Sequence, residues 1–435
     1  MQLNTRKLKK LIIKAVPYAV FSYVGNLIGF AYRTAEGEGF QEKILPFMSN
    51  LGVAFARIIP SLHPFDILFG LVLAGVMRLV LYVKSKNRKK FRQGEEYGSA
   101  VWGGEKDIEP YMDLSCPENN VILTKTESLT MGKPSAPKFA RNKNILVIGG
   151  SGSGKTRFFV KPNLMQMHSS YCVTDPKGTI LVECGKMLKR GKYKIKVLNT
   201  INFAKSMHYN PFAYLRSEKD ILKLVNTIIV NTKGEGQQSG EDFWVKAEKL
   251  YYTALIAYIW YEAPEEEQNF PMVMELLRAG EVHEDDDSYQ SPLDELFERL
   301  EMREPDHIAV KYYKDYHLGS AKTLKSIQIT LAARLEKFNL SSLAALTATD
   351  ELDLSSLGEK KTVLFALIPD DDTSYNFLVS ILYTQLFQQL FYLADHKYGG
   401  RLPVHVHFLM DEFANVSLPD DFDKILSVMR SREVS

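Results

Sequence analysis

The residues best suited to chemistry form a glycine-rich run that matches the pattern of a phosphate-binding loop. The run consists of Gly149, Gly150, Ser151, Gly152, Ser153, Gly154, Lys155 and Thr156. In such a loop, backbone N–H groups surround the phosphates of a nucleotide, the lysine reaches the β and γ oxygens, and the hydroxyl ligates Mg²⁺. The sequence therefore predicts ATP and Mg²⁺ as cofactors, with Lys155 and Thr156 in these two roles. A glycine-rich turn without a ligand is the alternative.

A pair of adjacent carboxylates, Asp411 and Glu412, follows the apolar run Val404 to Met410. A phosphate-binding loop needs a metal-holding carboxylate at the end of a neighbouring strand, and Asp411 would hold Mg²⁺ there through water. Glu412 would polarise the attacking water, so the pair indicates hydrolysis rather than binding alone. A pair of surface carboxylates is the alternative interpretation. We expect His405 and His407, within the run, to be packing residues rather than metal ligands.

These residues need a rigid sheet to position them, and several short apolar runs supply candidate strands. The runs are Ile145 to Ile148, Tyr171 to Thr174, Ile195 to Leu198, Val363 to Ile368 and Val404 to Met410. Continuous rather than alternating apolar strands are typical of a parallel sheet that is buried on both faces. A helix is expected to follow the loop over Arg157 to Met167, and Pro162 should end or kink it early.

Helical patterns dominate the long interval between the loop and the carboxylate pair. Helical periodicity is clear in Asp242 to Tyr261 and in Thr323 to Phe338, with a polar loop at Asn231 to Glu241 before them. This favours an all-helical domain inserted into an α/β domain, which resumes with a helix over Tyr375 to His396. No Leu-Ser-Gly-Gly-Gln segment precedes Asp411, which argues against a transporter cassette.

Two apolar runs near the N-terminus are long enough to cross a bilayer as helices. Ala15 to Tyr32 and Ile67 to Val83 each approach the roughly 17 to 25 residues that a span needs. Lys and Arg cluster before the first run and after the second, which places both ends in the cytoplasm. A signal peptide is the alternative for the first run. A buried core helix is the alternative for the second, because Arg78 is costly at mid-bilayer.

Bulk composition is consistent with a large intracellular protein but does not identify a partner. Lys and Arg number 54 against 52 Asp and Glu, so the net charge of +2 neither favours nor excludes nucleic acid. The three cysteines have no metal-ligand spacing and are typical of a reduced cytosolic body. One local feature stands out: residues 262–306 carry 16 acidic and 3 basic side chains. Such a segment is either a solvated face or a surface for a basic protein, and it would repel phosphate backbones.

Taken together, the motifs resemble the type IV secretion coupling proteins, the conjugative DNA-transfer ATPases of the TraG and TraD kind. The resemblance covers nearly the whole chain and rests on the loop, the two N-terminal runs, the helical insertion, and four further motifs besides the carboxylate pair with Phe413. These four are Tyr97-Gly98-Ser99-Ala100, Asp175-Pro176-Lys177-Gly178, Asn210-Pro211-Phe212 and Met429-Arg430-Ser431-Arg432.

The resemblance implies a RecA-like P-loop NTPase with a parallel sheet, assembled as a homo-hexamer at the inner face of the bacterial cell membrane. It also implies recruitment of a relaxase with its single-stranded DNA, or of a protein substrate, to the components of a type IV secretion channel. In such rings an arginine from the neighbouring subunit completes the ATP site. Arg430 is the candidate for this catalytic arginine, and Arg432 is the second candidate.

The expected organisation is an α/β motor with an inserted all-helical domain and an N-terminal anchor of two transmembrane helices. The boundaries are 1–92 for the anchor, 93–212 and 351–435 for the two parts of the motor, and 213–350 for the helical domain. We expect the family pattern to continue past Ser435 into another central strand, and turnover by these 435 residues alone to be absent. Another ring translocase, of the FtsK kind, and a non-hydrolysing membrane scaffold are the alternative functions.

Overall fold

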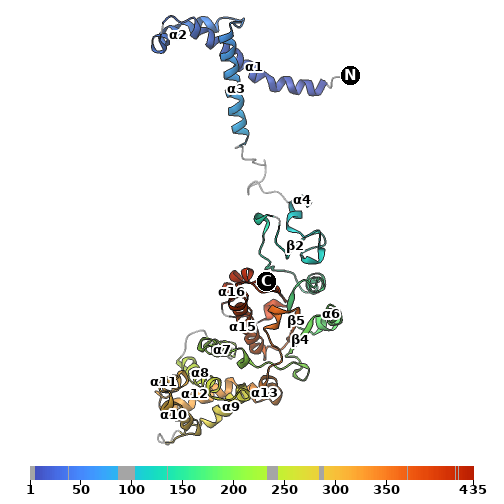
Figure 1. Ribbon diagram of the computed structural model, residues 1–435, viewed down its shortest axis with the longest axis vertical. Coiled ribbons are helices and arrows are strands. Elements are labelled where there is room, and N and C mark those ends of the chain that lie inside the picture. Colours follow the sequence, from blue (N-terminus) through green and yellow to red (C-terminus); the bar gives the residue numbers. More distant parts are fainter. Residues whose placement is uncertain are drawn as a thin grey trace. The chain divides into compact units, whose positions relative to one another are not determined.

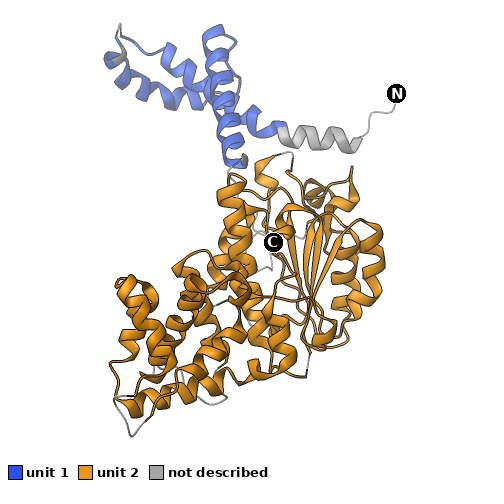
Figure 2. Ribbon diagram, turned by 60° about the horizontal axis from the view of Figure 1, so that its bottom comes forward, with its two compact units in different colours: residues 1–102 blue, residues 103–435 orange. Residues whose placement is uncertain are grey.

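The computed structural model forms two compact units, residues 1–102 and 103–435 (Figures 1 and 2). It describes residues 5–37, 39–86, 103–134, 136–232, 243–283, 289–369, 371–416, 418–419 and 421–435. The Tyr97–Ala100 motif, the boundary at residue 92 and most of the polar loop 231–241 lie outside the described residues. The predicted helical domain and the sheet belong to the same compact unit, so the four-part division remains a prediction.

Unit 1 consists of three helices, of which the first and third pack closely. They are α1 (Thr5–Arg33), α2 (Phe40–Phe55) and α3 (Pro64–Lys86). A Cβ atom added at Gly25 would lie 2.8 Å from the Cα of Gly70, and one added at Gly70 would collide with the carbonyl of Ser22. Glycine at both positions therefore lets the two backbones approach as small residues do between membrane helices.

Helix α3 is the part of unit 1 with the composition of a membrane span. Among the described residues, two helices are long and apolar enough to cross a membrane, namely Pro64–Ser85 and Asn376–Lys397. The first has a mean hydropathy of 2.0 and is 11% buried, whereas the second is 72% buried within unit 2 and is a core helix. The predicted second span is thus found in α3. The predicted first span is helical in α1, but α1 is not among the described helices that are long and apolar enough to cross a membrane.

Unit 2 is built on a four-stranded parallel sheet in the order β4-β5-β3-β6. The strands are β3 (Ser170–Thr174), β4 (Lys194–Asn199), β5 (Thr362–Leu367) and β6 (Val406–Met410). They match four of the five predicted strands. The last residues of the chain lie along the free side of β6, where the N–H of Val406 donates to the carbonyl of Glu433 at 2.9 Å and the N–H of Ser435 to that of Val406 at 3.0 Å.

The fifth predicted strand, Ile145 to Ile148, is not formed. Leu146 is 73% exposed and Ile148 is 87% exposed, and the segment makes no ladder with any described strand. A strand needs a neighbour to pair its backbone groups, and the free side of β6 is already occupied by the end of the chain. The strand predicted from this apolar run is therefore wrong, because the run finds no strand to pair with.

The two faces of the sheet bury alternate residues of each strand against different helices. On one face Tyr171 and Val173 pack with α5 (Lys161–Met165) and α6 (Thr179–Arg190). On the other face Cys172 belongs to a larger core that includes α15 (Asn376–Tyr392). Figure 2 shows helices on both sides of the sheet. Burial on both faces agrees with the continuous apolar runs of the sequence.

The interval between β4 and β5 is helical throughout its described part. Its helices are α7 (Glu218–Asn231), α8 (Phe243–Glu262), α9 (Phe270–Ala279), α10 (Pro292–Arg303), α11 (Ile308–Tyr316), α12 (Ala321–Arg334), α13 (Ser341–Ala348) and α14 (Ser356–Glu359). The periodicities read from the sequence correspond to α8 and α12. The core of these helices is continuous with that of α15 and one face of the sheet.

Shorter elements complete unit 2. The hairpin of β1 (Asn120–Ile122) and β2 (Ser128–Thr130) is antiparallel, α4 (Glu105–Ile108) precedes it, and α16 (Phe422–Val428) follows β6. Directly after the phosphate-binding loop, the helix starts with a π-turn, Thr156–Val160, before α5. Pro162 lies in the first turn of α5, where its missing N–H is tolerated. The helix expected over Arg157 to Met167 is thus found as this π-turn followed by α5.

Candidate nucleotide-binding site

The glycine-rich loop adopts backbone angles that its glycines permit. Gly152 and Gly154 have φ of +75° and +84°, a region that side chains with a Cβ rarely enter. Lys155 and Thr156 then lead directly into the helical turn. Because the first N–H groups of a helix lack partners within it, this junction offers donors to an anion.

The ammonium of Lys155 reaches back across the loop. Its Nζ donates to the carbonyls of Gly149 at 2.9 Å and Gly150 at 3.1 Å. The charge is therefore held over the concave side of the loop, where the phosphates of a nucleotide would lie.

Thr156 and Asp411 meet although they are 255 positions apart in the chain. The Thr156 hydroxyl donates to Oδ2 of Asp411, and the Asp411 residue is 7% exposed. Asp411 directly follows β6, so the sheet carries it to the loop. A hydroxyl and a carboxylate are the hard oxygen ligands that Mg²⁺ prefers, and phosphates and water usually complete such a set. The chemistry of this pair thus fits the predicted metal.

Glu412 is turned outward by an unusual backbone conformation. It has φ of +50° and ψ of +46°, and its side chain is exposed. Its N–H donates to Oδ1 of Asp411 at 3.2 Å, and its carbonyl accepts from the N–H of Asn415 at 2.8 Å. Left-handed backbone at a residue other than glycine is costly and is concentrated at functional sites. The turn presents Glu412 at the same edge of the sheet as Asp411.

Sequence reasoning singled out Asp175 only as part of a motif and assigned it no role. It follows β3 in the position that Asp411 occupies after β6, since Thr174 and Met410 are paired in register. Its Oδ2 accepts the N–H of Leu181 at 2.9 Å, while its buried Oδ1 has no partner among the described residues. Burial raises the pKa of the Asp175 carboxyl. A lone acidic residue ending an apolar strand next to the loop was the signal that could have identified it.

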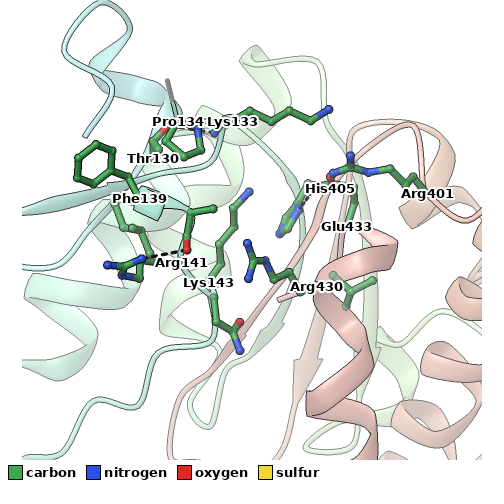
Figure 3. A pocket seen from close by; sticks show the side chains of 15 residues that line it. Thr130, Lys133, Pro134, Phe139, Arg141, Lys143, Arg401, His405, Arg430 and Glu433 are labelled. Atoms are coloured by element: carbon green, nitrogen blue, oxygen red, sulfur yellow. Dashed lines mark hydrogen bonds and ion pairs between the residues drawn. The ribbon is translucent and has the colours of Figure 1, made fainter. Parts of the chain in front are cut away.

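The two candidate arginines differ in their surroundings. Arg432 forms an ion pair with Asp395 at 2.8 Å, and its guanidinium lies 4.9 Å from the centre of the Phe391 ring. Arg430 is exposed and has no ion pair among the described residues. It lies beside His405, at the amino end of β6, whereas Asp411 lies at the carboxyl end (Figure 3). Neither arginine is thus brought to the phosphate-binding loop of its own chain.

The acidic segment 262–306 is partly neutralised within the helical region. Seven of its described carboxylates pair with lysine or arginine side chains, three of them with lysines from the basic stretch that follows. These three pairs are Glu281 with Lys325, Glu301 with Lys314 and Asp306 with Lys311, and the pairs within the segment are Glu262 and Glu304 with Arg303, Glu275 with Arg278 and Glu295 with Arg299. Residues 284–288 lie outside the described part. The surface is less acidic than its composition suggests, and a basic partner remains a prediction.

Residues 109–434 match the model of the family described as type IV secretory system conjugative DNA transfer. The chain belongs to this family. No curated protein matches the chain. The conjugative coupling protein TrwBdeltaN70, unbound and monoclinic, is 14% identical with a TM-score of 0.45, over 65% of this chain and 58% of that one. TrwB with the ATP analogue ADPNP and TrwB with ADP and Mg²⁺ are each 14% identical, with a TM-score of 0.44, over 65% of this chain and 60% of theirs.

Proposed function

We propose that this member of the conjugative DNA-transfer family is a membrane-bound ATPase that couples a relaxase with its single-stranded DNA to a type IV secretion channel. One observation carries the enzymatic part of the proposal. The Thr156 hydroxyl and the Asp411 carboxylate, far apart in sequence, are joined at the mouth of the glycine-rich loop. That arrangement is what a nucleotide-bound Mg²⁺ requires.

Each residue of the site would have a separate task. The loop Gly149, Gly150, Ser151, Gly152, Ser153 and Gly154 would bind phosphate oxygens through backbone N–H groups, and Lys155 would neutralise the β and γ oxygens. Thr156 and Asp411 would hold Mg²⁺, and Glu412 would orient water and accept its proton. ATP with Mg²⁺ supplies the phosphoryl bond whose cleavage energises translocation.

Arg430 is the proposed catalytic arginine that acts on a neighbouring subunit. Arg432, the second candidate, is engaged in an ion pair with Asp395, whereas Arg430 forms no ion pair among the described residues. Its position at the amino edge of the sheet supports a role in another copy of the chain rather than its own, as a homo-hexameric ring would need. An arginine placed on a transferring phosphate contributes about 10³ to 10⁵ in rate in related enzymes.

The proposed anchor consists of α1 and α3, with the motor in the cytoplasm and the protein multi-pass in the bacterial inner membrane. The apolar, exposed surface of α3 supports this anchor. The close packing of α1 against α3 would hold the less apolar α1 in the membrane beside it. In this proposal residues 1–92 are the anchor, 93–212 and 351–435 the motor, and 213–350 the helical domain. This chain spans less than two thirds of the length of the TrwB structures that it matches.

The test combines nucleotide binding with conjugative transfer in cells. Lys155→Ala should weaken binding of a fluorescent ATP analogue, because the loop loses its only side-chain cation. Glu412→Gln should leave binding intact and abolish transfer, because orientation of water fails after binding. Lys186→Ala, on the exposed side of α6, is the matched control and should change neither.

Wild-type transfer in either Lys155→Ala or Glu412→Gln cells would contradict the motor function. If the variants behave as expected but transfer needs neither a relaxase nor channel components, the ring-translocase alternative of the FtsK kind is correct instead. A relaxase gene and channel genes beside this one would support the coupling role.

A further inference from the structure

A small basic cavity lies in unit 2, at the amino edge of the sheet. Figure 3 shows it between the segment that follows β2 and the residues that flank β6. Its volume is about 100 Å³. The side chains that determine its chemistry are Lys133, Lys143, Arg401, His405, Arg430 and Glu433.

The cavity carries more positive charge than its single carboxylate can balance. Glu433 is already engaged, since it pairs with the Arg401 guanidinium and accepts from His405 at 2.9 Å. The Lys143 ammonium donates to the carbonyl of Met131 and has no carboxylate partner among the described residues. The same holds for Lys133 and Arg430 within that part of the chain. Three cations therefore surround a space that contains no free carboxylate of the described residues.

The electrostatic cost of this arrangement is visible at Lys143. Burial lowers the pKa of its ammonium, and the nearby charges of Arg401 and Arg430 lower it further, against the opposing effect of Glu433. In Figure 3 the Lys143 and Arg430 side chains extend into the same space beside His405. A bound anion would relieve this repulsion, because opposite charges within a few ångström favour the charged form of each group.

The cavity is distinct from the glycine-rich loop. His405 precedes the five residues of β6 and Asp411 follows them. At about 3.3 Å per residue, the six steps from His405 to Asp411 separate the two places by roughly 20 Å. A nucleotide held by the loop of the same chain therefore does not reach the cavity.

We propose that this cavity binds a single phosphate group. Sites for drug-sized ligands span about 300 to 1,000 Å³, so a nucleoside does not fit, whereas a tetrahedral oxyanion does. Arginine and lysine donors match such an oxyanion, with charge-assisted hydrogen bonds. Two sources share this chemistry: free inorganic phosphate, and the terminal phosphate of a nucleotide held by a second copy of the chain. The second source rests on the proposed ATPase ring, and the first does not.

The first arm of the test measures inorganic phosphate alone. Lys155→Ala removes the main cation of the glycine-rich loop, and phosphate binding to this variant is followed by ³¹P NMR line broadening in chloride buffer of constant ionic strength. Adding Lys143→Gln should weaken the apparent affinity about tenfold, since a hydrogen bond to a charged group contributes about 1.5 to 3 kcal/mol. Lys133→Gln, an exposed residue that cannot disturb folding through burial, should act in the same direction. Lys125→Gln, exposed on the β1–β2 turn, is the control and should have no effect.

The second arm presents the nucleotide on another copy. Wild-type chain loaded with ADPNP is mixed with Lys155→Ala chain, and association is measured by light scattering. If the phosphate comes from the neighbour, association should require ADPNP and should weaken when Lys143→Gln is placed in the Lys155→Ala copy. Phosphate binding in the first arm with no such association assigns the site to free phosphate.

Unchanged phosphate affinity and unchanged association in both Lys143→Gln and Lys133→Gln would overturn the proposal. Failure of the ATPase function gives a different pattern. Wild-type chain would then not bind ADPNP at all, while the first arm would still report on the cavity.

Discussion

Thr156 and Asp411 form the contact on which the proposed metal chemistry depends. Asp411→Asn keeps the shape of the side chain but removes its charge, so it should weaken Mg²⁺-dependent nucleotide binding about tenfold and leave Mg²⁺-independent binding nearly unchanged. The measurement is titration of a fluorescent ATP analogue with and without Mg²⁺. Asp423→Asn on α16, exposed and outside the site, should change neither. An equal loss in both conditions would mean that Asp411 shapes the loop rather than holding metal.

Asp175 offers a separate test at the same edge of the sheet. Its folded pKa is raised, so the charged form is disfavoured by burial, and the associated stability is present at low pH and lost as pH rises through that pKa. Asp175→Asn should therefore be at least as stable as wild type at pH 7. Asp175→Leu leaves the N–H of Leu181 without its acceptor and should cost about 1 to 3 kcal/mol. Chemical denaturation monitored by circular dichroism compares them.

If Asp175→Asn proves as destabilising as Asp175→Leu, the carboxylate is ionised in the native state and has a cationic or metal partner. Retained stability with lost transfer would instead place Asp175 in the nucleotide chemistry.

Among the helices, the crossing of α1 and α3 depends on glycine. Gly70→Val should separate the helices, because its side chain would collide with the carbonyl of Ser22. The expected result is a thermal midpoint lower by several degrees for the detergent-solubilised protein, consistent with a loss of about 1 to 3 kcal/mol from overpacking. Gly75→Val lies in the same helix with nothing within 4 Å of the new Cβ, and it should leave the midpoint unchanged.

Equal midpoints for Gly70→Val and Gly75→Val would show that α1 and α3 do not pack at this crossing. Fluorescence-detected size-exclusion chromatography after heating gives the comparison directly in detergent.

The sequence predicted the elements that local residue patterns determine. It failed where a strand depends on pairing with a distant segment. The run Val404 to Met410 shows this well, since both the strand β6 and the meeting of Asp411 with the loop were expected from it. Ile145 to Ile148 has the same composition but lies unpaired and exposed. Strand formation depends on which neighbour satisfies the backbone, and no single segment encodes its neighbour.

For the site, the sequence supplied the loop residues and the carboxylate pair because their spacing follows from phosphate chemistry. It placed Arg430 before Arg432 only through the family resemblance and gave no physical reason to separate them. That distinction depends on Asp395, whose contact with Arg432 is made only by the folded chain. The cavity beside Lys143 and His405 gave no signal either, because it is assembled from distant segments, and His405 was expected only to be a packing residue.

Across unit 2 as a whole, three histidines that are buried or partly buried make stability depend on pH. Burial lowers the pKa of His168 to about 3, and it also lowers the pKa values of His405 and His407. The fold therefore disfavours their protonated forms, whereas the unfolded chain protonates them near the ordinary value of 6.5. Stability is therefore full above about pH 6.5 and falls as pH decreases below it.

His168, whose folded pKa lies well below the measured range, is expected to contribute a loss that approaches about 1.4 kcal/mol per pH unit below 6.5, and His405 and His407 act in the same direction. Denaturant midpoints between pH 7.5 and 5 measure the slope, and His407→Asn should reduce it. His396→Gln, an exposed histidine, is the control. A flat profile from pH 7.5 to 5 would show that the three side chains take up protons without unfolding.

The strand order of the sheet has a consequence for how this family can vary. The chain leaves the sheet at the end of β4 and returns on β5, its direct neighbour, and the N–H of Thr200 donates to the carbonyl of Leu367 at 3.0 Å at their shared end. Because β4 and β5 are parallel, the chain leaves at the carboxyl end of β4 and returns at the amino end of β5, so the connection must at least cross back over the length of one strand. Beyond that crossover, the interior of the excursion can lengthen, shorten or be exchanged while Asp411, on the far side of β3, keeps its place opposite the loop.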